Sequence, residues 1–228
     1  MRIICVADTH LTHDEYTGVP GELPWPLPEG DMIIHAGDWT FRGRPHEIFR
    51  FGRWFNSLPY KYKVCIAGNH DLGMEDAPER SKKVLFGLDE EYYAEPKRND
   101  IIYLQDEEIN IEGLRIYGAP WSPRFFDWAF NADRGAKIKA KWDKIPEGVD
   151  ILITHGPPFG YGDETARAGP VGCEELRIAL DRVKPRLHIF GHIHPGYGKY
   201  TYNNTTLVNA AMCDETYYPA NPPIVVDL

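Results

Sequence analysis

Five short apolar segments, each followed at once by acidic, amide or imidazole side chains, constrain the fold of this chain more than any other feature. Near-continuous runs of Ile and Val of this length predict strands that are buried on both faces of a sheet. They lie at residues 2–7, 32–36, 64–67, 151–154 and 187–190. Because segments with helical character at 45–58 and 172–183 alternate with these strands, we expect an α/β core.

Six further segments carry strand signals, and several are joined by Gly or Asn turns as in hairpins. They lie at residues 101–104, 108–111, 114–117, 200–202, 206–208 and 224–226. A second, partly antiparallel sheet is therefore expected, which gives a sandwich of two mixed sheets flanked by helices. With 228 residues, of which 43% are hydrophobic, the chain is long enough for one sizeable core, and we expect a single domain over residues 1–228.

The charge of the chain limits the partners that it can bind. It has 25 Lys and Arg against 34 Asp and Glu, a formal net charge of −9, so it offers no general basic surface to a long nucleic acid. The four cysteines form no CxxC pair, which favours a reduced protein. The sequence has the pattern of neither a signal peptide nor a membrane span, so we expect a cytoplasmic protein without membrane contact.

The polar side chains that follow the five strands form short motifs. These are ADTH at 7–10, HAGD at 35–38, AGNH at 67–70, THG at 154–156 and GHIH at 191–194. In open α/β sheets, ligands collect at the carboxyl ends of the strands. In extended chain, side chains two residues apart point the same way, so Asp8 and His10 can converge on one ion, and so can His192 and His194.

The two middle motifs suggest different roles for their polar residues. Asp38 follows a Gly that permits a sharp turn, and its two carboxylate oxygens can bridge two cations. Asn69 and His70 are adjacent, so the simplest division gives the amide oxygen of Asn69 to a metal and leaves His70 over the substrate. We therefore predict Asp38 as the bridging ligand and His70 as a proton donor.

The ordered set D-x-H, G-D, G-N-H-D, H and G-H-x-H resembles the calcineurin-like metallophosphoesterase superfamily, whose fold is a four-layer α/β/β/α sandwich. Within it, HAGD, GNHD, HGPPFGYGD, GHIHPGYG and NPPIVVDL resemble the metallophosphoesterase-domain-containing family, which is related to class III cyclic nucleotide phosphodiesterases; this similarity spans nearly the whole chain. The resemblance implies one metal held by Asp8, His10, Asp38 and His194, and a second held by Asp38, Asn69, His155 and His192. Asp71 resembles the acidic neighbour that orients His70 in that family.

Two divalent metal ions are therefore the expected cofactors. Nitrogen and oxygen ligands fit Mn²⁺, our first expectation, and also Fe, Zn, Co or Mg. Together with Asp8, Asp38 and a bridging hydroxide, two such ions leave roughly one positive charge, which favours an anionic substrate. We expect the hydroxide to hydrolyse a small phosphodiester, such as a cyclic nucleotide, with His70 and Asp71 in catalytic roles.

Three other functions compete with this one. A phosphomonoesterase of the same fold is the main alternative, because the same dinuclear centre serves both reactions. A nuclease is disfavoured because the composition provides no basic track. A non-catalytic metal-binding scaffold is disfavoured because no expected ligand is missing.

Several other residues receive plainer interpretations. His35 and His188 lie in strands and are expected to pack or to support the site, whereas His46 is expected on a helix surface. His13 is the remaining histidine with a position that could line the pocket.

The connection at 119–134 and the one at 11–30 are long enough to be functional. Aromatic side chains at 121–130 are expected to cap the core in preference to stacking on a nucleobase. Arg124 and Arg134 are expected in solvated surface pairs, and the thiols of Cys5 and Cys65 in the core.

Overall fold

All five predicted apolar strands form, and they are divided between two sheets. The computed structural model describes residues 1–12, 26–93 and 99–228. The first sheet takes β1 (Arg2–Val6), β2 (Met32–Ala36) and β3 (Tyr62–Ile66), and the second takes β9 (Ile151–Thr154) and β12 (Leu187–Phe190). The predicted ends were slightly long, because Ala7 and Ala67 lie just after their strands.

The first sheet has the order β15-β1-β2-β3-β4, with β4 at Ile101–Tyr103 and β15 at Ile224–Asp227. Strands β1 to β4 run parallel, and β15 pairs antiparallel with β1. Val6 lies opposite His35, and His35 lies opposite Cys65. The carboxyl ends of β1, β2 and β3 are therefore level, so the polar residues that follow them meet.

The second sheet is also mixed, in the order β13-β14-β12-β9-β6-β5. Its other strands are β5 (Glu107–Ile111), β6 (Leu114–Ala119), β13 (Gly198–Tyr202) and β14 (Thr205–Asn209). The hairpins β5–β6 and β13–β14 are antiparallel, as predicted, while β9 pairs in parallel with β6 and β12. Two sheets of mixed direction are thus confirmed.

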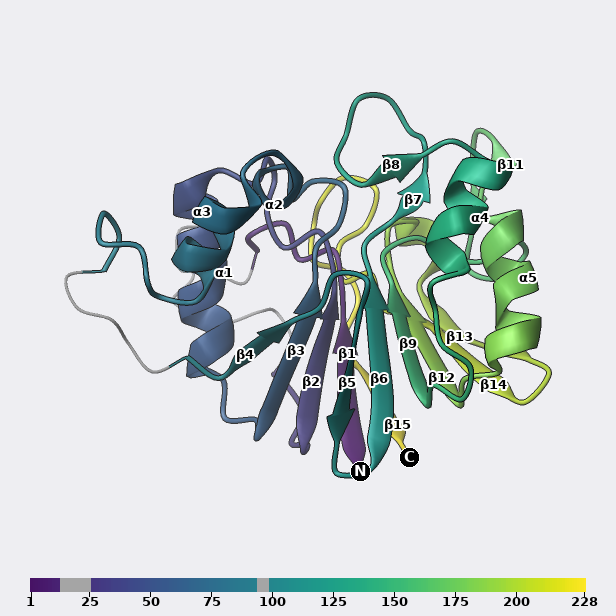
Figure 1. The fold of residues 1–228 in the computed structure, drawn as a ribbon, viewed down its shortest axis with the longest axis horizontal. Coiled ribbons are helices and arrows are strands. Elements are labelled where there is room, and N and C mark those ends of the chain that lie inside the picture. The colour runs from purple at the N-terminus through teal and green to yellow at the C-terminus, as the bar shows by residue number, and fades with distance from the viewer. Residues whose placement is uncertain (13–25, 94–98) are drawn as a thin grey trace.

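Helices cover the outer face of each sheet, which gives the predicted four layers (Figure 1). They are α1 (Pro45–Ser57), α2 (Gly73–Asp76), α3 (Pro78–Leu85), α4 (Ala136–Trp142) and α5 (Glu174–Val183). Figure 1 shows α1 and α3 beside the first sheet and α4 and α5 beside the second. Over the described ranges, no helix combines the length and apolarity needed to cross a membrane.

The core explains why the strands that precede the motifs are so apolar. In β1, Ile3 and Cys5 pack between the two sheets, while Ile4 and Val6 pack under α1. Every one of these side chains is fully buried, and each buried aliphatic side chain stabilises the fold by about 1.5–3 kcal/mol. Cys65 is buried in the same way, so the predicted core positions of Cys5 and Cys65 are confirmed.

Candidate metal centre

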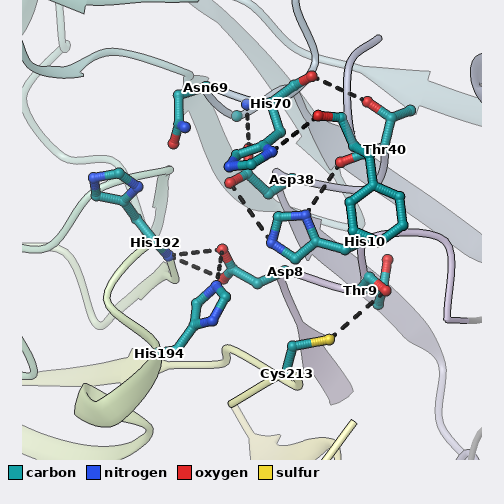
Figure 2. Close-up of polar contacts among 12 residues, drawn as sticks. Asp8, Thr9, His10, Asp38, Thr40, Asn69, His70, His192, His194 and Cys213 are labelled. Carbon is teal, nitrogen blue, oxygen red and sulfur yellow. Dashed lines mark hydrogen bonds and ion pairs between the residues drawn. The ribbon is translucent and has the colours of Figure 1, made fainter. Parts of the chain in front are cut away.

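The polar motifs after five strands meet in one cluster. Asp8 and His10 follow β1, Asp38 follows β2, Asn69 follows β3, His155 follows β9, and His192 and His194 follow β12. Figure 2 shows the first-sheet residues Asp8, His10, Asp38 and Asn69 facing His192 and His194 from the second sheet. The site therefore lies where the carboxyl ends of β1, β2 and β3 meet those of β9 and β12.

Three groups of side chains in this cluster have ligand atoms within 4.8 Å of one another. The groups are Asp8, His10 and His194; His10, Asp38 and His70; and Asp38, His155 and His192. Asn69 adjoins the third group, since its Oδ1 lies 2.9 Å from Nε2 of His155. All seven predicted ligands are thus brought together, and His70, predicted to stay off the metals, lies within the same short range.

The electrostatics of the cluster fit divalent cations. Among the described residues, Nε2 of His10 is buried without a hydrogen-bond partner, a condition that a bound ion would relieve. Burial lowers the pKa of His10 to about 4 and that of His192 to about 3, so both imidazoles are neutral and offer lone pairs. Burial alone would raise the pKa of the Asp38 carboxyl, but His155 holds it well below its usual value.

His155 illustrates how a proton competes with a metal here. Its Nε2 lies 3.3 Å from Oδ2 of Asp38. Burial acts to lower the pKa of His155, but Asp38 and then Asp8 act to raise it, and the result is about 9. In the metal-free protein a proton therefore occupies the interaction that an ion would take, and metal binding should release it.

The backbone at the ligands differs from the sequence expectation. Asp8, His10, Asp38 and His192 have φ values of 51°, 40°, 56° and 68°, in the left-handed region that few non-glycine residues adopt. Extended alternation was therefore the wrong reason for the convergence of Asp8 with His10. The chain turns instead, and strain of about 1–3 kcal/mol per residue is typical of such functional positions.

Two glycines make room for the carboxylates. A Cβ atom at Gly191 would collide with the carboxylate of Asp8, and one at Gly68 would collide with Asp38. Gly37 has a φ of 97°, which confirms the predicted sharp turn before Asp38.

Backbone carbonyl oxygens orient the imidazole rings of the cluster. In each ring, Nδ1 hydrogen-bonds to a main-chain carbonyl oxygen. The distances are 3.2 Å from His10 to Thr40, 3.0 Å from His70 to Phe41, 2.9 Å from His155 to Ala36 and 2.7 Å from His194 to Asp214. Since Nδ1 is taken by a carbonyl oxygen in each ring, Nε2 is the nitrogen that can bind a metal or a substrate. These acceptors belong to the main chain, so no side-chain motif could have revealed them.

Asp71 corrects one predicted role. Its carboxylate accepts hydrogen bonds from the N–H groups of Asp38, Thr40 and Gly68 at 2.8–3.0 Å, and from the Thr40 hydroxyl at 2.7 Å. Within the described residues it makes no bond to the His70 ring, whose Nδ1 faces the Phe41 carbonyl instead. Asp71 therefore ties together the turns that follow β2 and β3, and the prediction that it orients His70 directly was wrong.

A cavity of about 280 Å³ opens beside the cluster. Asp38, Asn69, His70, His192 and His194 form part of its lining. Phe125 and Tyr217 line it as well. The sequence analysis did not single out Tyr217, which lies in the connection between β14 and β15.

The aromatic connection after β6 only partly matches its expected role. Phe130 is buried, and the ring of Trp121 meets it at 5.6 Å, so these two cap the core as predicted. Phe125 and Phe126 are 53% and 73% exposed, which contradicts core capping for them. Trp128 stacks on His70 with ring centroids 4.2 Å apart.

The remaining interpretations are largely confirmed. His35 and His188 are buried and pair through Nε2 with the hydroxyls of Thr9 and Thr154 at 2.9 and 2.8 Å, while His46 is exposed on α1. His13 lies outside the described residues. The exposed pairs of the two arginines are Arg124 with Asp133 and Arg134 with Glu174.

Comparisons with known proteins agree with this geometry. The sequence model of the calcineurin-like phosphoesterase family matches residues 1–196. Metallophosphoesterase domain-containing protein 1 of Homo sapiens and of Mus musculus is 46% identical over 239 aligned residues, covering 100% of this chain and 71% of each relative.

Solved structures share the fold at low sequence identity. Phosphopantetheinyl hydrolase (PptH) from Mycobacterium tuberculosis has a TM-score of 0.54 at 12% identity, covering 97% of this chain and 95% of that one. TT1561 of Thermus thermophilus has a TM-score of 0.54 at 13% identity, covering 91% and 88%.

Proposed function

This chain belongs to the calcineurin-like phosphoesterase family and is a metal-dependent phosphoesterase, and on that premise we propose that it hydrolyses small phosphodiesters, with cyclic nucleotides as the expected substrates. Two bound divalent ions, for which Mn²⁺ is our first choice, supply an activated water and positive charge for the phosphoryl group. The protein must supply the ligands, the proton for the leaving group and the choice of substrate.

The charge around the cavity supports a diester over a monoester. Over residues 1–12, 26–93 and 99–228, no Lys or Arg lines the cavity, whereas Glu215 does. A phosphomonoester carries about 1.5 to 2 negative charges at pH 7, and a diester carries one. Since the walls add the carboxylate of Glu215 and no Lys or Arg side chain, they disfavour the more highly charged ester.

The spacing of the side chains supports two metal sites that share Asp38. In this proposal one ion is held by Asp8, His10, Asp38 and His194, and the other by Asp38, Asn69, His155 and His192. The ion pairs His194–Asp8 at 3.4 Å and His155–Asp38 at 3.3 Å lie within the respective sets. Asp38 is assigned to both because its ligand atoms fall in two of the close groups.

His70 is assigned to the leaving group. Its Nδ1–H donates to the Phe41 carbonyl at 3.0 Å, so its Nε2 is the atom that can give a proton to the departing oxygen. Trp128 stacks on the ring with centroids 4.2 Å apart, which helps to fix the orientation of the imidazole. The side chain also lines the cavity.

Hydrolysis of bis-p-nitrophenyl phosphate and of p-nitrophenyl phosphate by the Mn²⁺-loaded protein tests the proposal. We expect the diester to have the larger kcat/KM, and Glu215→Gln to raise the monoester rate relative to the diester rate. Glu147→Gln, at an exposed position, is the matched control and should change neither. A monoester preference in the wild type would instead identify a phosphatase.

The thiols support a reducing compartment such as the cytoplasm. Cys5, Cys65, Cys173 and Cys213 are all free and buried, and burial raises the pKa of Cys5 to about 12. Such thiols pack as small apolar groups and are poor nucleophiles. Localisation of a tagged chain by fluorescence checks this assignment.

A further inference from the structure

Exposed aromatic side chains gather beside the cavity. Seven large hydrophobic side chains are exposed in the described ranges, and five of them are aromatic. These five are Phe41, Phe125, Phe126, Tyr217 and Tyr218. Two of them, Phe125 and Tyr217, line the cavity, and exposed apolar side chains concentrated at a cleft mark a ligand site.

Tyr217 is held over one end of the ligand cluster. Its ring centroid lies 4.8 Å from that of His10 and 5.7 Å from that of His194, yet the side chain is 42% exposed. Its φ of 63° is unfavourable for a tyrosine. The surrounding loop must therefore maintain this placement.

Asp214 organises that loop. Its carboxylate accepts hydrogen bonds from the N–H groups of Thr216 and Tyr218 at 2.8 and 3.1 Å. Its carbonyl oxygen accepts from both the Tyr217 N–H at 3.0 Å and Nδ1 of His194 at 2.7 Å. The position of the Tyr217 ring is thereby tied to the orientation of a predicted metal ligand.

Phe125 is held over the other end of the cluster, with its ring 6.5 Å from that of His192. Here the side-chain amide of Asn131 organises the loop, accepting from the Phe125 N–H at 3.1 Å and donating to the carbonyls of Phe126 and Trp128 at 2.9 Å. Phe125 meets the ring of Phe126 at 4.6 Å, and both stay exposed. As at Tyr217, a polar side chain fixes a loop that presents an aromatic ring to the cavity.

We propose that Phe125 and Tyr217 form an aromatic mouth that selects phosphoesters carrying a flat ring near the phosphorus. This inference rests on the proposed function, because it requires the phosphoryl group to bind at the ligand cluster between the two rings. A planar group on an ester oxygen then packs against the faces or edges of these side chains, whereas a small alkyl group leaves them in water. Neither ring takes part in the chemical step.

Binding of phenylphosphonate and methylphosphonate to the Mn²⁺-loaded protein, measured by calorimetry, tests the aromatic mouth without turnover. The two probes carry the same phosphonate group, so the ratio of their Kd values reports the ring. We expect phenylphosphonate to bind about tenfold more tightly, and Phe125→Ala and Tyr217→Asn each to reduce this ratio about threefold or more. Asn is chosen because it tolerates the left-handed backbone at that position.

The control variants separate ring stacking from other effects. Tyr217→Phe keeps the ring and should keep the ratio. Tyr218→Ala and Phe126→Ala remove exposed rings that do not line the cavity, and should leave the ratio unchanged. For bis-p-nitrophenyl phosphate, Tyr217→Asn should raise KM and leave kcat nearly constant.

Equal binding of the two probes by the wild type, or an equal loss of both in the variants, would overturn the aromatic mouth. So would an equal effect of Tyr218→Ala. If phenylphosphonate is preferred but no diester is hydrolysed, the mouth stands and the proposed function fails. If diesters are hydrolysed without ring preference, the proposed function stands and the mouth fails.

Discussion

The strand ends and the aromatic loops meet at one cavity, but they are built by different means. Asp8, Asp38 and His155 are buried, and they follow strands whose register places their ends level. Phe125 and Tyr217 are exposed on connections that are fixed by single polar side chains. We assign the metal chemistry to the strand ends of the two sheets, and the choice of substrate to the loops.

Removing Asp38, the proposed shared ligand, should have the largest effect. Asp38→Ala deletes a side chain assigned to both metal sites, so metal content and diester turnover should fall together, turnover by about 1,000-fold or more. Elemental analysis and kinetics on the same preparation measure both. Retention of two ions by the variant would show that Asp38 is not a shared ligand.

His70 provides a sharper test, because the structure also places it at ligand distance. Its ring nitrogen lies within 4.8 Å of ligand atoms of His10 and Asp38, the same limit that the other two groups meet. His70→Ala should keep the metal content and lower turnover by about 100- to 10,000-fold, the range for general acid–base catalysis. His46→Ala, at an exposed site on α1, is the control. Metal loss equal to that of Asp38→Ala would make His70 a ligand.

Asp71 tests whether the strand ends depend on a buried support. Asp71→Asn places an amide group among four donors that now bind carboxylate oxygens. It should cost about 1–3 kcal/mol of stability and about 10- to 100-fold in metal affinity. Urea unfolding and metal titration measure the two losses. Asp133→Asn removes only surface ion pairs with Arg124 and Lys137 and should change each quantity little. Unaltered metal affinity in Asp71→Asn would contradict the supporting role of Asp71.

The smallest effect concerns the histidines beneath the site. Burial lowers the pKa of His188 to about 3, against about 6.5 in an unfolded chain. Between pH 6.5 and pH 3 the unfolded chain therefore binds a proton at His188 that the folded state does not bind. The stability that comes from keeping His188 neutral is complete above pH 6.5 and is lost as the pH falls.

In metal-free protein, the free energy of unfolding should therefore fall less steeply with decreasing pH in His188→Gln. The slope should be smaller by up to about 1.4 kcal/mol per pH unit between pH 6 and 4. Gln can keep the hydrogen bond to Thr154. His46→Gln is the matched control at an exposed position. Urea unfolding at several pH values provides the measurement, and an unchanged slope in His188→Gln would contradict the lowered pKa.

The sequence predicted the two sheets and the meeting of the motifs well, because apolar runs that end abruptly in Asp or His carry both signals in local composition. It did not predict the left-handed backbone at Asp8 and Asp38, which arises where the turns after β1 and β2 hydrogen-bond to each other. The partner of His70 was missed because it is a main-chain carbonyl. Tyr217 was missed because its role depends on a loop brought back to the site by the sheet order.

Titration of metal-free protein with Mn²⁺, following bound metal and bis-p-nitrophenyl phosphate turnover together, tests the dinuclear site most directly. We predict that two equivalents bind per chain, that protons are released as they bind, and that turnover requires the second equivalent. Saturation at one equivalent with full turnover would contradict the assignment of seven ligands to two ions.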